Sequence, residues 1–288
     1  MEIEVKGHSG CQIDVVREDG QLYVYKSSRD PKYLARLALQ AEKQHRAALP
    51  ELQHIRVPKV HAIDRIDGMV SVKMDYVYSK NFVEFFEQAG FEQVGYLVDA
   101  LIMYLEREIK DSPLAVVPRS VVTDKFADVR DKTLANKSFE GDGEIEEIMD
   151  ASQRVFDALS DMLIPVGTCH GDLTFSNILF NGNNYYLIDF LDSFIESPLL
   201  DIVKLRQDTA WLWSQLMYVH PCDTIRLRIA FGKIDAELDN YFASRYEWYG
   251  RYYRPLQLMN FLRILQYAHE PAVIDYLKQA INEQLKEF

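Results

Sequence analysis

One segment of this 288-residue chain combines the side chains that phosphoryl transfer requires. Asp172 follows His170 by two residues, Asn177 follows Asp172 by five, and Asp189 lies twelve residues beyond Asn177. One carboxylate can orient or accept the proton of an acceptor hydroxyl, while an amide and a second carboxylate can hold Mg2+ on the phosphates of ATP. We therefore predict that Asp172 is the catalytic carboxylate and that Asn177 and Asp189 are magnesium ligands.

The spacing between the two predicted metal ligands has a geometric reason. Asn177 precedes an apolar segment, Asn181-Gly182 is a typical hairpin turn, and Asp189 ends the returning segment. An antiparallel hairpin would bring both oxygen ligands to the same end. An isolated HGD triplet could also be an ordinary polar turn, so the hairpin and the final aspartate are needed for the prediction.

The H-G-D-x4-N pattern at residues 170–177 resembles the catalytic loop of the aminoglycoside phosphotransferase and choline kinase family, the small-molecule branch of the protein-kinase-like fold. Protein kinases usually have Arg where Gly171 stands, which favours a small-molecule acceptor over a protein. The resemblance implies that His170 and Asp201, which lies twelve residues after Asp189, support the catalytic loop through hydrogen bonds.

The resemblance also assigns residues near the start of the chain to the nucleotide. Lys26 is similar to the lysine that contacts the α- and β-phosphates, and Glu42 lies where the ion-pair partner of that lysine would be. Gly7, Ser9 and Gly10 would form the loop that covers the phosphates, because glycine lets backbone amides approach them closely. This loop departs from the usual G-x-G-x-x-G pattern.

A hinge that meets the adenine base is expected after the last strand of the first part. Asp75 and Val77 occupy this position, which implies that their backbone contacts adenine. The assignment comes from position in the chain, and an ordinary strand end would have the same residue types.

Two stretches of different character must position these residues. The first has alternating apolar residues, Asp-Gly pairs typical of hairpin turns, and a helical segment that opens with proline. Its predicted elements are strands that include Ile3–Val5, Ile13–Val16, Leu22–Tyr25, Val57–Val60 and Met69–Met74, and a helix at Pro31–Ala48.

The remainder of the chain is predicted to be mostly helical. Apolar stripes indicate helices at Tyr96–Glu108 and Glu144–Leu163 and several more within Leu227–Leu285, while the polar stretch Asp111–Gly143 is expected to be a loop-rich insertion. The aromatic cluster at residues 246–253 is typical of a core-facing helix, and a wall of a substrate pocket is the alternative.

These elements and the resemblance together predict an α+β, two-lobed protein-kinase-like fold. Residues 1–77 would form a small antiparallel β-rich lobe that binds the nucleotide, and residues 78–288 a larger, mainly helical lobe for catalysis and substrate binding. ATP would lie in the cleft.

The amino-acid composition limits the classes of molecule that the protein could bind. The chain has 44 acidic and 32 basic residues, a net charge of −12, which disfavours nucleic-acid binding and mildly favours a cationic acceptor. No apolar run approaches the roughly 18 residues that a membrane span needs. Three widely spaced cysteines, Cys11, Cys169 and Cys222, suit a reducing compartment and favour a cytoplasmic location. The oligomeric state stays undecided.

We therefore predict an enzyme that uses Mg2+ and ATP to phosphorylate a hydroxyl group of a small molecule, such as an amino sugar, an aminoglycoside, a choline-like compound or a sugar. A nucleotide-binding pseudokinase without turnover is one alternative, prompted by the irregular glycine loop. The presence of Asp172, Asn177 and Asp189 argues against it. A protein kinase is the other alternative, and Gly171 argues against that one.

Overall fold

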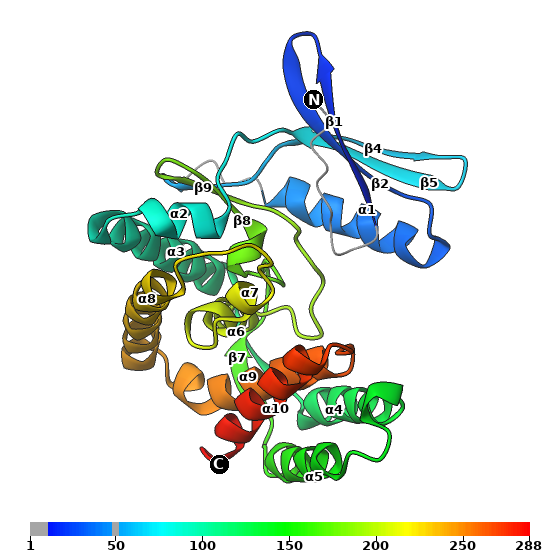
Figure 1. Cartoon of the computed structure of the whole chain (residues 1–288), viewed down its shortest axis with the longest axis vertical. Coiled ribbons are helices and arrows are strands. Elements are labelled where there is room, and N and C mark those ends of the chain that lie inside the picture. Colours follow the sequence, from blue (N-terminus) through cyan, green and yellow to red (C-terminus); the bar gives the residue numbers. More distant parts are fainter. Residues whose placement is uncertain (1–10, 48–51) are drawn as a thin grey trace. The chain divides into compact units, whose positions relative to one another are not determined.

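A computed structural model describes residues 11–47 and 52–288 of the chain (Figure 1). The strands are β1 (Gln12–Glu18), β2 (Gln21–Ser28), β3 (Ile55–Arg56), β4 (Val60–Ile66), β5 (Met69–Asp75), β6 (Leu114–Val117), β7 (Met162–Pro165), β8 (Ile178–Asn181) and β9 (Asn184–Leu187). The helices are α1 (Pro31–Arg46), α2 (Phe82–Gln88), α3 (Phe91–Asp111), α4 (Arg119–Leu134), α5 (Gly143–Asp157), α6 (Pro198–Thr209), α7 (Trp213–Leu216), α8 (Thr224–Arg245), α9 (Glu247–Leu265) and α10 (Pro271–Leu285), with short 3-10 turns η1 (Lys137–Phe139) and η2 (Phe175–Asn177).

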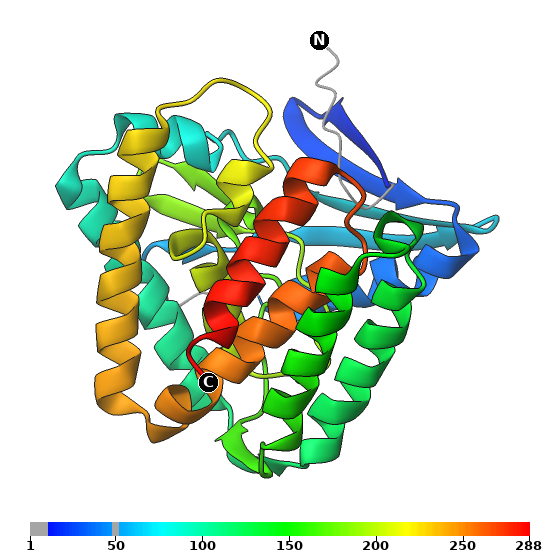
Figure 2. The same ribbon diagram turned by 60° about the horizontal axis from the view of Figure 1, so that its bottom comes forward.

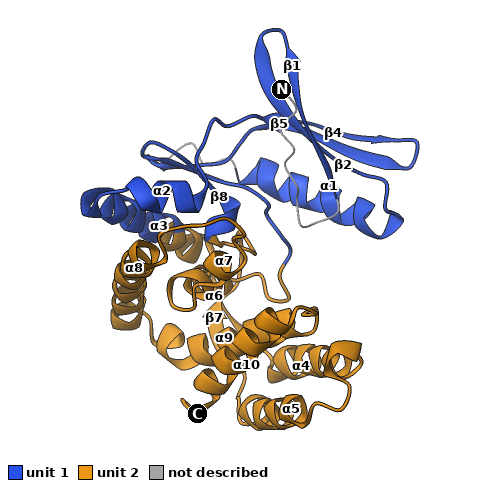
Figure 3. Ribbon diagram, in the orientation of Figure 1, with its two compact units in different colours: residues 1–104, 175–192 blue, residues 105–174, 193–288 orange. Residues whose placement is uncertain are grey.

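The chain folds into two compact units (Figure 3). Unit 1 comprises residues 1–104 and 175–192, and unit 2 comprises residues 105–174 and 193–288. The predicted boundary near residue 77 is a different division, between a nucleotide-binding lobe and a catalytic lobe. It stays a prediction.

A four-stranded antiparallel sheet with strand order β1-β2-β5-β4 forms one part of unit 1. Its two predicted turns are confirmed. Asp19 and Gly20 have φ values of 49° and 84°, and Asp67 and Gly68 have 50° and 72°, as a type I′ hairpin turn requires. Asp and Gly adopt such values more readily than bulkier residues, which explains why the strands reverse at these points.

Helix α1 packs against this sheet. It begins at Pro31 after Asp30, whose side chain accepts a hydrogen bond from the backbone N–H of Lys32. It ends at Arg46, short of the predicted end at residue 48, which lies outside the described residues. The buried residues that join helix and sheet are Leu37, Ala38, Ala41, Val60, Val70 and Val72.

The second sheet of unit 1 carries the predicted hairpin. Its strand order is β3-β9-β8, with β8 antiparallel to β9 and β3 parallel to it. Helix α2 covers part of this sheet, and the ring of Phe85 stacks on that of Phe180 with a centroid distance of 4.4 Å. The predicted strand Val57–Val60 is wrong, because β3 ends before it and β4 begins only at Val60. Pro58 has no N–H to contribute to a strand ladder.

Unit 2 is mainly helical, as predicted, but two local predictions are wrong. The stretch Asp111–Gly143 contains strand β6 and helix α4 and is not mainly loop. Val122, Phe126, Val129 and Thr133 form the buried stripe of α4. Seven charged residues share the helix with these four positions and obscure their helical spacing in the sequence.

The other wrong prediction is the single helix over Glu144–Leu163. Helix α5 ends at Asp157, and β7 follows and pairs antiparallel with β6. Met162 and Ile164 are buried whereas Leu163 is half exposed, a period of two that indicates a strand. In Figure 2, α4 and α5 run side by side and α10 crosses α9, and each of these pairs is in contact.

The aromatic cluster at residues 246–253 opens helix α9. Trp248, Tyr249 and Tyr252 are buried, as expected of a core-facing helix. No helix in the described part of the chain is long and apolar enough to cross a membrane.

Candidate active site

The segment with the HGD triplet lies in unit 2 and is held by the first turn of α6. Asp201 is completely buried, and its carboxylate accepts hydrogen bonds from the backbone N–H groups of His170 and Gly171, the latter at 2.7 Å. Gly171 has a φ of 88°, a conformation that side chains with a Cβ rarely adopt. This turn and the clamp from Asp201 fix the backbone immediately before Asp172.

Asp172 is held by its own backbone as well. Its N–H donates to Nδ1 of His170 at 3.2 Å, which requires that nitrogen to be unprotonated, and its carbonyl accepts from the N–H of Thr174 at 2.8 Å. Its carboxylate Oδ1 lies 3.0 Å from Nζ of Lys204 on α6, an ion pair whose side chains are only 26% and 16% exposed. The sequence prediction did not include Lys204, although its position three residues after Asp201 places both on one face of α6.

The two predicted metal ligands lie in unit 1, at the open end of the β8–β9 hairpin. Ile178 pairs with Leu187, and the carbonyl of Asn177 accepts from the N–H of Ile188 at 3.0 Å. Asp189 is the next residue, with a φ of 60°. The hairpin therefore places Asn177 and Asp189 at the same end.

Lys26 reaches Asp189 from the first sheet. Its Nζ lies 2.6 Å from Oδ1 of Asp189, and the side chains are 9% and 45% exposed. Burial lowers the pKa of Lys26, but the charge of Asp189 and its hydrogen bond outweigh burial and raise the pKa above its ordinary value. The lysine is therefore a buried, fixed cation beside a carboxylate that is open to solvent.

The predicted ion pair between Lys26 and Glu42 is wrong. The carboxylate of Glu42 is half exposed and pairs with Arg65 on β4 at 3.3 Å. The next residue of α1, Lys43, is buried instead, and its Nζ donates to the backbone carbonyl of Leu191 at 2.6 Å. Consecutive residues of a helix point about 100° apart, so Glu42 and Lys43 face different directions. The residue of α1 that is buried is therefore the basic Lys43 and not the acidic Glu42.

Of the two hinge candidates, Asp75 is the last residue of β5 and Val77 lies two residues beyond it. The N–H of Asp75 donates to the carbonyl of Lys59 at 3.0 Å, and its carboxylate lies 2.7 Å from Nε2 of His61. The carbonyl of Val77 accepts from Oγ of Ser79 at 3.4 Å. A role of this segment in adenine binding stays a prediction. The loop of Gly7, Ser9 and Gly10 lies outside the described residues.

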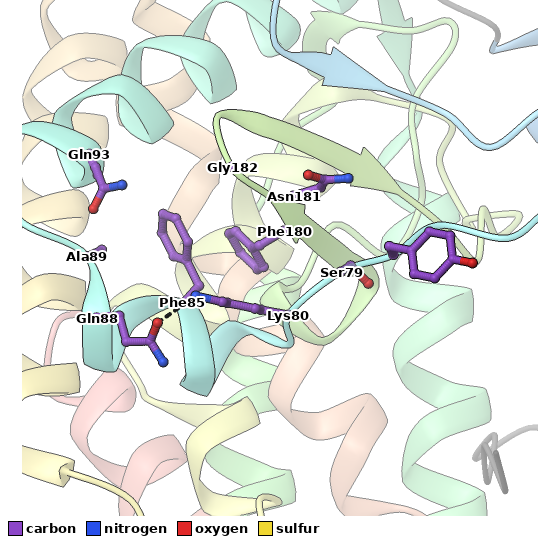
Figure 4. Close-up of a pocket in the computed structure, with 10 residues that line it drawn as sticks. Ser79, Lys80, Phe85, Gln88, Ala89, Gln93, Phe180, Asn181 and Gly182 are labelled. Carbon is purple, nitrogen blue, oxygen red and sulfur yellow. Dashed lines mark hydrogen bonds between the residues drawn. The ribbon is translucent and has the colours of Figure 1, made fainter. Parts of the chain in front are cut away.

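A pocket of about 370 Å³ opens just beyond the hinge candidates (Figure 4). Among the residues that line it are Tyr78–Lys80, Phe85, Phe180, Asn181 at the end of β8, and Gly182 in the turn that follows. Lys80 donates to Oε1 of Gln88 across the pocket. The turn is the closed end of the hairpin. Four strand residues, about 13 Å, separate it from the end with the predicted metal ligands.

The side chains at the open end of the hairpin suit magnesium. An amide oxygen and a carboxylate are hard oxygen ligands, and Mg2+ is usually bound through one or two protein groups together with water and nucleotide phosphates. Within residues 11–47 and 52–288 no group of three or more His, Cys, Asp and Glu residues could hold a metal by itself. Asn177 and Asp189 therefore fit a cation that arrives with a nucleotide.

Comparison with known proteins points to one family. Residues 12–256 match a family described as "Phosphotransferase enzyme family". No curated protein matches the sequence.

Several solved structures share the fold. A thermostable mutant of the aminoglycoside phosphotransferase APH(4)-Ia, in complex with AMP-PNP and hygromycin B, is 10% identical with a TM-score of 0.68 over 99% of this chain and 93% of that chain. The GDP and kanamycin complex of APH(2")-IIIa is 17% identical, with a TM-score of 0.59 over 99% and 93%. The amicoumacin kinase hAmiN, with AMP-PNP and Ca2+, is 11% identical, with a TM-score of 0.59 over 98% and 87%. These similarities confirm the predicted α+β, protein-kinase-like fold.

Proposed function

Since this chain belongs to the phosphotransferase enzyme family, we propose that it uses Mg2+ and ATP to phosphorylate a hydroxyl group of a small molecule. The observation that carries this proposal is the contact between Lys26 and Asp189 at the hairpin end that also holds Asn177. A buried cation, a carboxylate and an amide are the groups that bind nucleotide phosphates and their metal.

In this proposal the residues of unit 1 hold the nucleotide. Lys26 contacts its phosphates, and Asn177 and Asp189 hold Mg2+, which would neutralise charge on the phosphate oxygens. The ion pair between Lys26 and Asp189 holds the two side chains next to each other before the nucleotide binds. Holding them in advance reduces the entropy cost of binding.

Asp172 orients the acceptor hydroxyl and accepts its proton as the phosphoryl group is transferred. It lies in unit 2, but only five residues separate it from Asn177 in the chain. Their Cα atoms can therefore be no more than about 18 Å apart, however the units are arranged. The clamp from Asp201 fixes the loop between them at its start, and such positioning is the main contribution a protein makes to this reaction.

The proposal includes several classes of acceptor. The net charge of −12 favours a cationic acceptor such as an amino sugar or an aminoglycoside. Structures with the same fold hold hygromycin B and kanamycin. Choline-like compounds and neutral sugars are the other candidates. We propose ATP as the donor, and GTP is the donor to compare with it because one of these structures holds GDP.

A coupled assay of ADP release with Mg2+ tests the proposal. The wild-type protein is given ATP, or GTP in parallel, with a panel of aminoglycosides, choline, ethanolamine, amino sugars and neutral sugars. We expect release that depends on one acceptor class and is lost in Asp172→Ala. Nucleotide binding without release for any acceptor would instead support the non-catalytic alternative, and the absence of binding would contradict the proposal entirely.

A further inference from the structure

One face of helix α6 is directed at the catalytic loop of unit 2. Asp201, in the first turn of α6, binds the backbone N–H groups of His170 and Gly171. Lys204 follows three residues later, which is close to one helical turn, so it lies on the same face. Its ammonium reaches the carboxylate of the next loop residue, Asp172, at 3.0 Å.

The second cation of α6 has a different task. Arg206 donates two hydrogen bonds of 2.8 Å to the carboxylate of Asp235 on α8 and a third to the hydroxyl of Tyr249 on α9 at 2.6 Å. It lies two residues beyond Lys204, and therefore on another side of the helix. Arg206 joins helices to one another, whereas Lys204 is the cation of α6 that contacts a predicted catalytic side chain.

We propose that Lys204 is a positioning residue for phosphoryl transfer, which holds the carboxylate of Asp172 in the orientation that receives the acceptor hydroxyl. This inference rests on the proposed function. Asp201 holds the backbone N–H groups of His170 and Gly171, and Lys204 adds a constraint on the side chain of Asp172 from the same helix.

An ammonium beside the catalytic carboxylate is compatible with the chemistry. A carboxylate has two oxygens and about four acceptor sites, so a bond from Lys204 to Oδ1 leaves capacity for the acceptor hydroxyl. The transition state of phosphoryl transfer is loose, and catalysis depends mainly on position and electrostatics and little on the strength of the base. Correct orientation of Asp172 therefore matters more than its strength as a base.

The test compares Lys204→Met and Lys204→Arg with a matched control. Methionine keeps the length of the side chain without its charge, and arginine restores the charge. Lys278 on α10 pairs with Asp142 in the same unit, with side chains 14% and 27% exposed against 16% and 26% for Lys204 and Asp172. Lys278 also pairs with Glu144 at 3.0 Å, so Lys278→Met removes ion pairs of similar burial on residues outside the catalytic loop.

We expect Lys204→Met to lower kcat about 10- to 100-fold, the size of effect that misplacement of a reacting group causes. Binding of Mg-AMP-PNP should be unchanged, Lys204→Arg should recover part of kcat, and Lys278→Met should remain within twofold of wild type. In an Asp172→Asn background, Lys204→Met should cause little further loss, because a residue that acts through Asp172 has nothing left to orient.

Three results would overturn the inference while wild type remains active. These are a kcat of Lys204→Met within twofold of wild type, an equal loss of kcat in Lys278→Met, and an undiminished further loss in the Asp172→Asn background. A wild-type protein that transfers phosphate to no acceptor would instead contradict the proposed function, and the inference would fall with it.

Discussion

Each unit contains a lysine–aspartate pair that includes a predicted site residue, and the two pairs differ in how they are built. In unit 1, Lys26 lies in the interior of a sheet and its partner Asp189 is 45% exposed. In unit 2, Lys204 lies on a helix and its partner Asp172 is 26% exposed. The partners are 163 residues apart in the first pair and only 32 apart in the second.

The difference corresponds to what each aspartate is proposed to do. A metal ligand must exchange its lysine for an incoming cation, and the open side of Asp189 allows that exchange. A residue that orients a hydroxyl must stay in place. Asp172 pairs with a lysine on the same helix whose Asp201 holds the backbone N–H groups of the two preceding residues. In the proposed function, one type of ion pair therefore serves nucleotide binding in unit 1 and orientation of the acceptor in unit 2.

The largest expected effect is the loss of turnover in Asp172→Asn. Removal of a group that takes part in proton transfer typically costs about 10²- to 10⁴-fold in rate. We expect kcat to fall by that amount while the affinity for Mg-AMP-PNP stays within about twofold. Steady-state ADP release gives the first quantity, and calorimetry gives the second. A variant with unchanged kcat would remove Asp172 from the mechanism.

Lys26→Met should affect nucleotide binding more than the chemical step. A hydrogen bond to a charged group contributes about 1.5–3 kcal/mol, which corresponds to roughly a 10- to 100-fold weaker affinity for Mg-AMP-PNP. Lys26→Arg serves as the control that keeps the charge. If both variants bind the nucleotide as wild type does, the pair in unit 1 has no part in nucleotide binding.

Glu42→Gln should have a small effect, in contrast with the loss expected if it oriented Lys26. Its pair with Arg65 is solvent-exposed, and exposed pairs contribute about 0–1 kcal/mol to stability. We expect nucleotide affinity and kcat within twofold of wild type. A loss as large as that of Lys26→Met would show that Glu42 and Lys26 form a pair during turnover.

A third kind of pair should affect stability alone. Lys125 and then Lys132 hold the pKa of Asp128 on α4 below its ordinary value, at about 2. Below pH 4 the unfolded chain binds a proton that the folded chain does not, so this contribution is present above pH 4 and is lost as the pH falls to 2. The difference in urea midpoint between wild type and Asp128→Asn should therefore shrink from pH 6 to pH 3. A constant difference would contradict the assignment, and kcat at pH 7 should be unchanged.

Much of the fold and part of the site could be predicted from the sequence because they depend on local signals. Asp-Gly turns, the hairpin and the H-G-D-x4-N pattern are each contained in short segments. The hairpin argument requires only that two strands be antiparallel, and the structure places Asn177 and Asp189 together as expected.

The remaining features depend on packing. To predict whether Glu42 or Lys43 is the buried residue of α1, one must know how the helix is rotated about its axis. The mixed polar and apolar sequence of α1 does not specify that rotation. Lys204 could be recognised only after Asp201 was known to face the catalytic loop, because the three-residue spacing then brings both to one face. The buried stripe of α4 could not be recognised in the sequence because only four positions define it.

The central claim is that the two pairs divide binding from turnover, and calorimetric titration of Mg-AMP-PNP into Asp189→Ala and Asp172→Ala tests it most directly. We predict that Asp189→Ala abolishes magnesium-dependent binding and that Asp172→Ala binds nearly as wild type does. An equal loss of binding in both variants would contradict this division of roles.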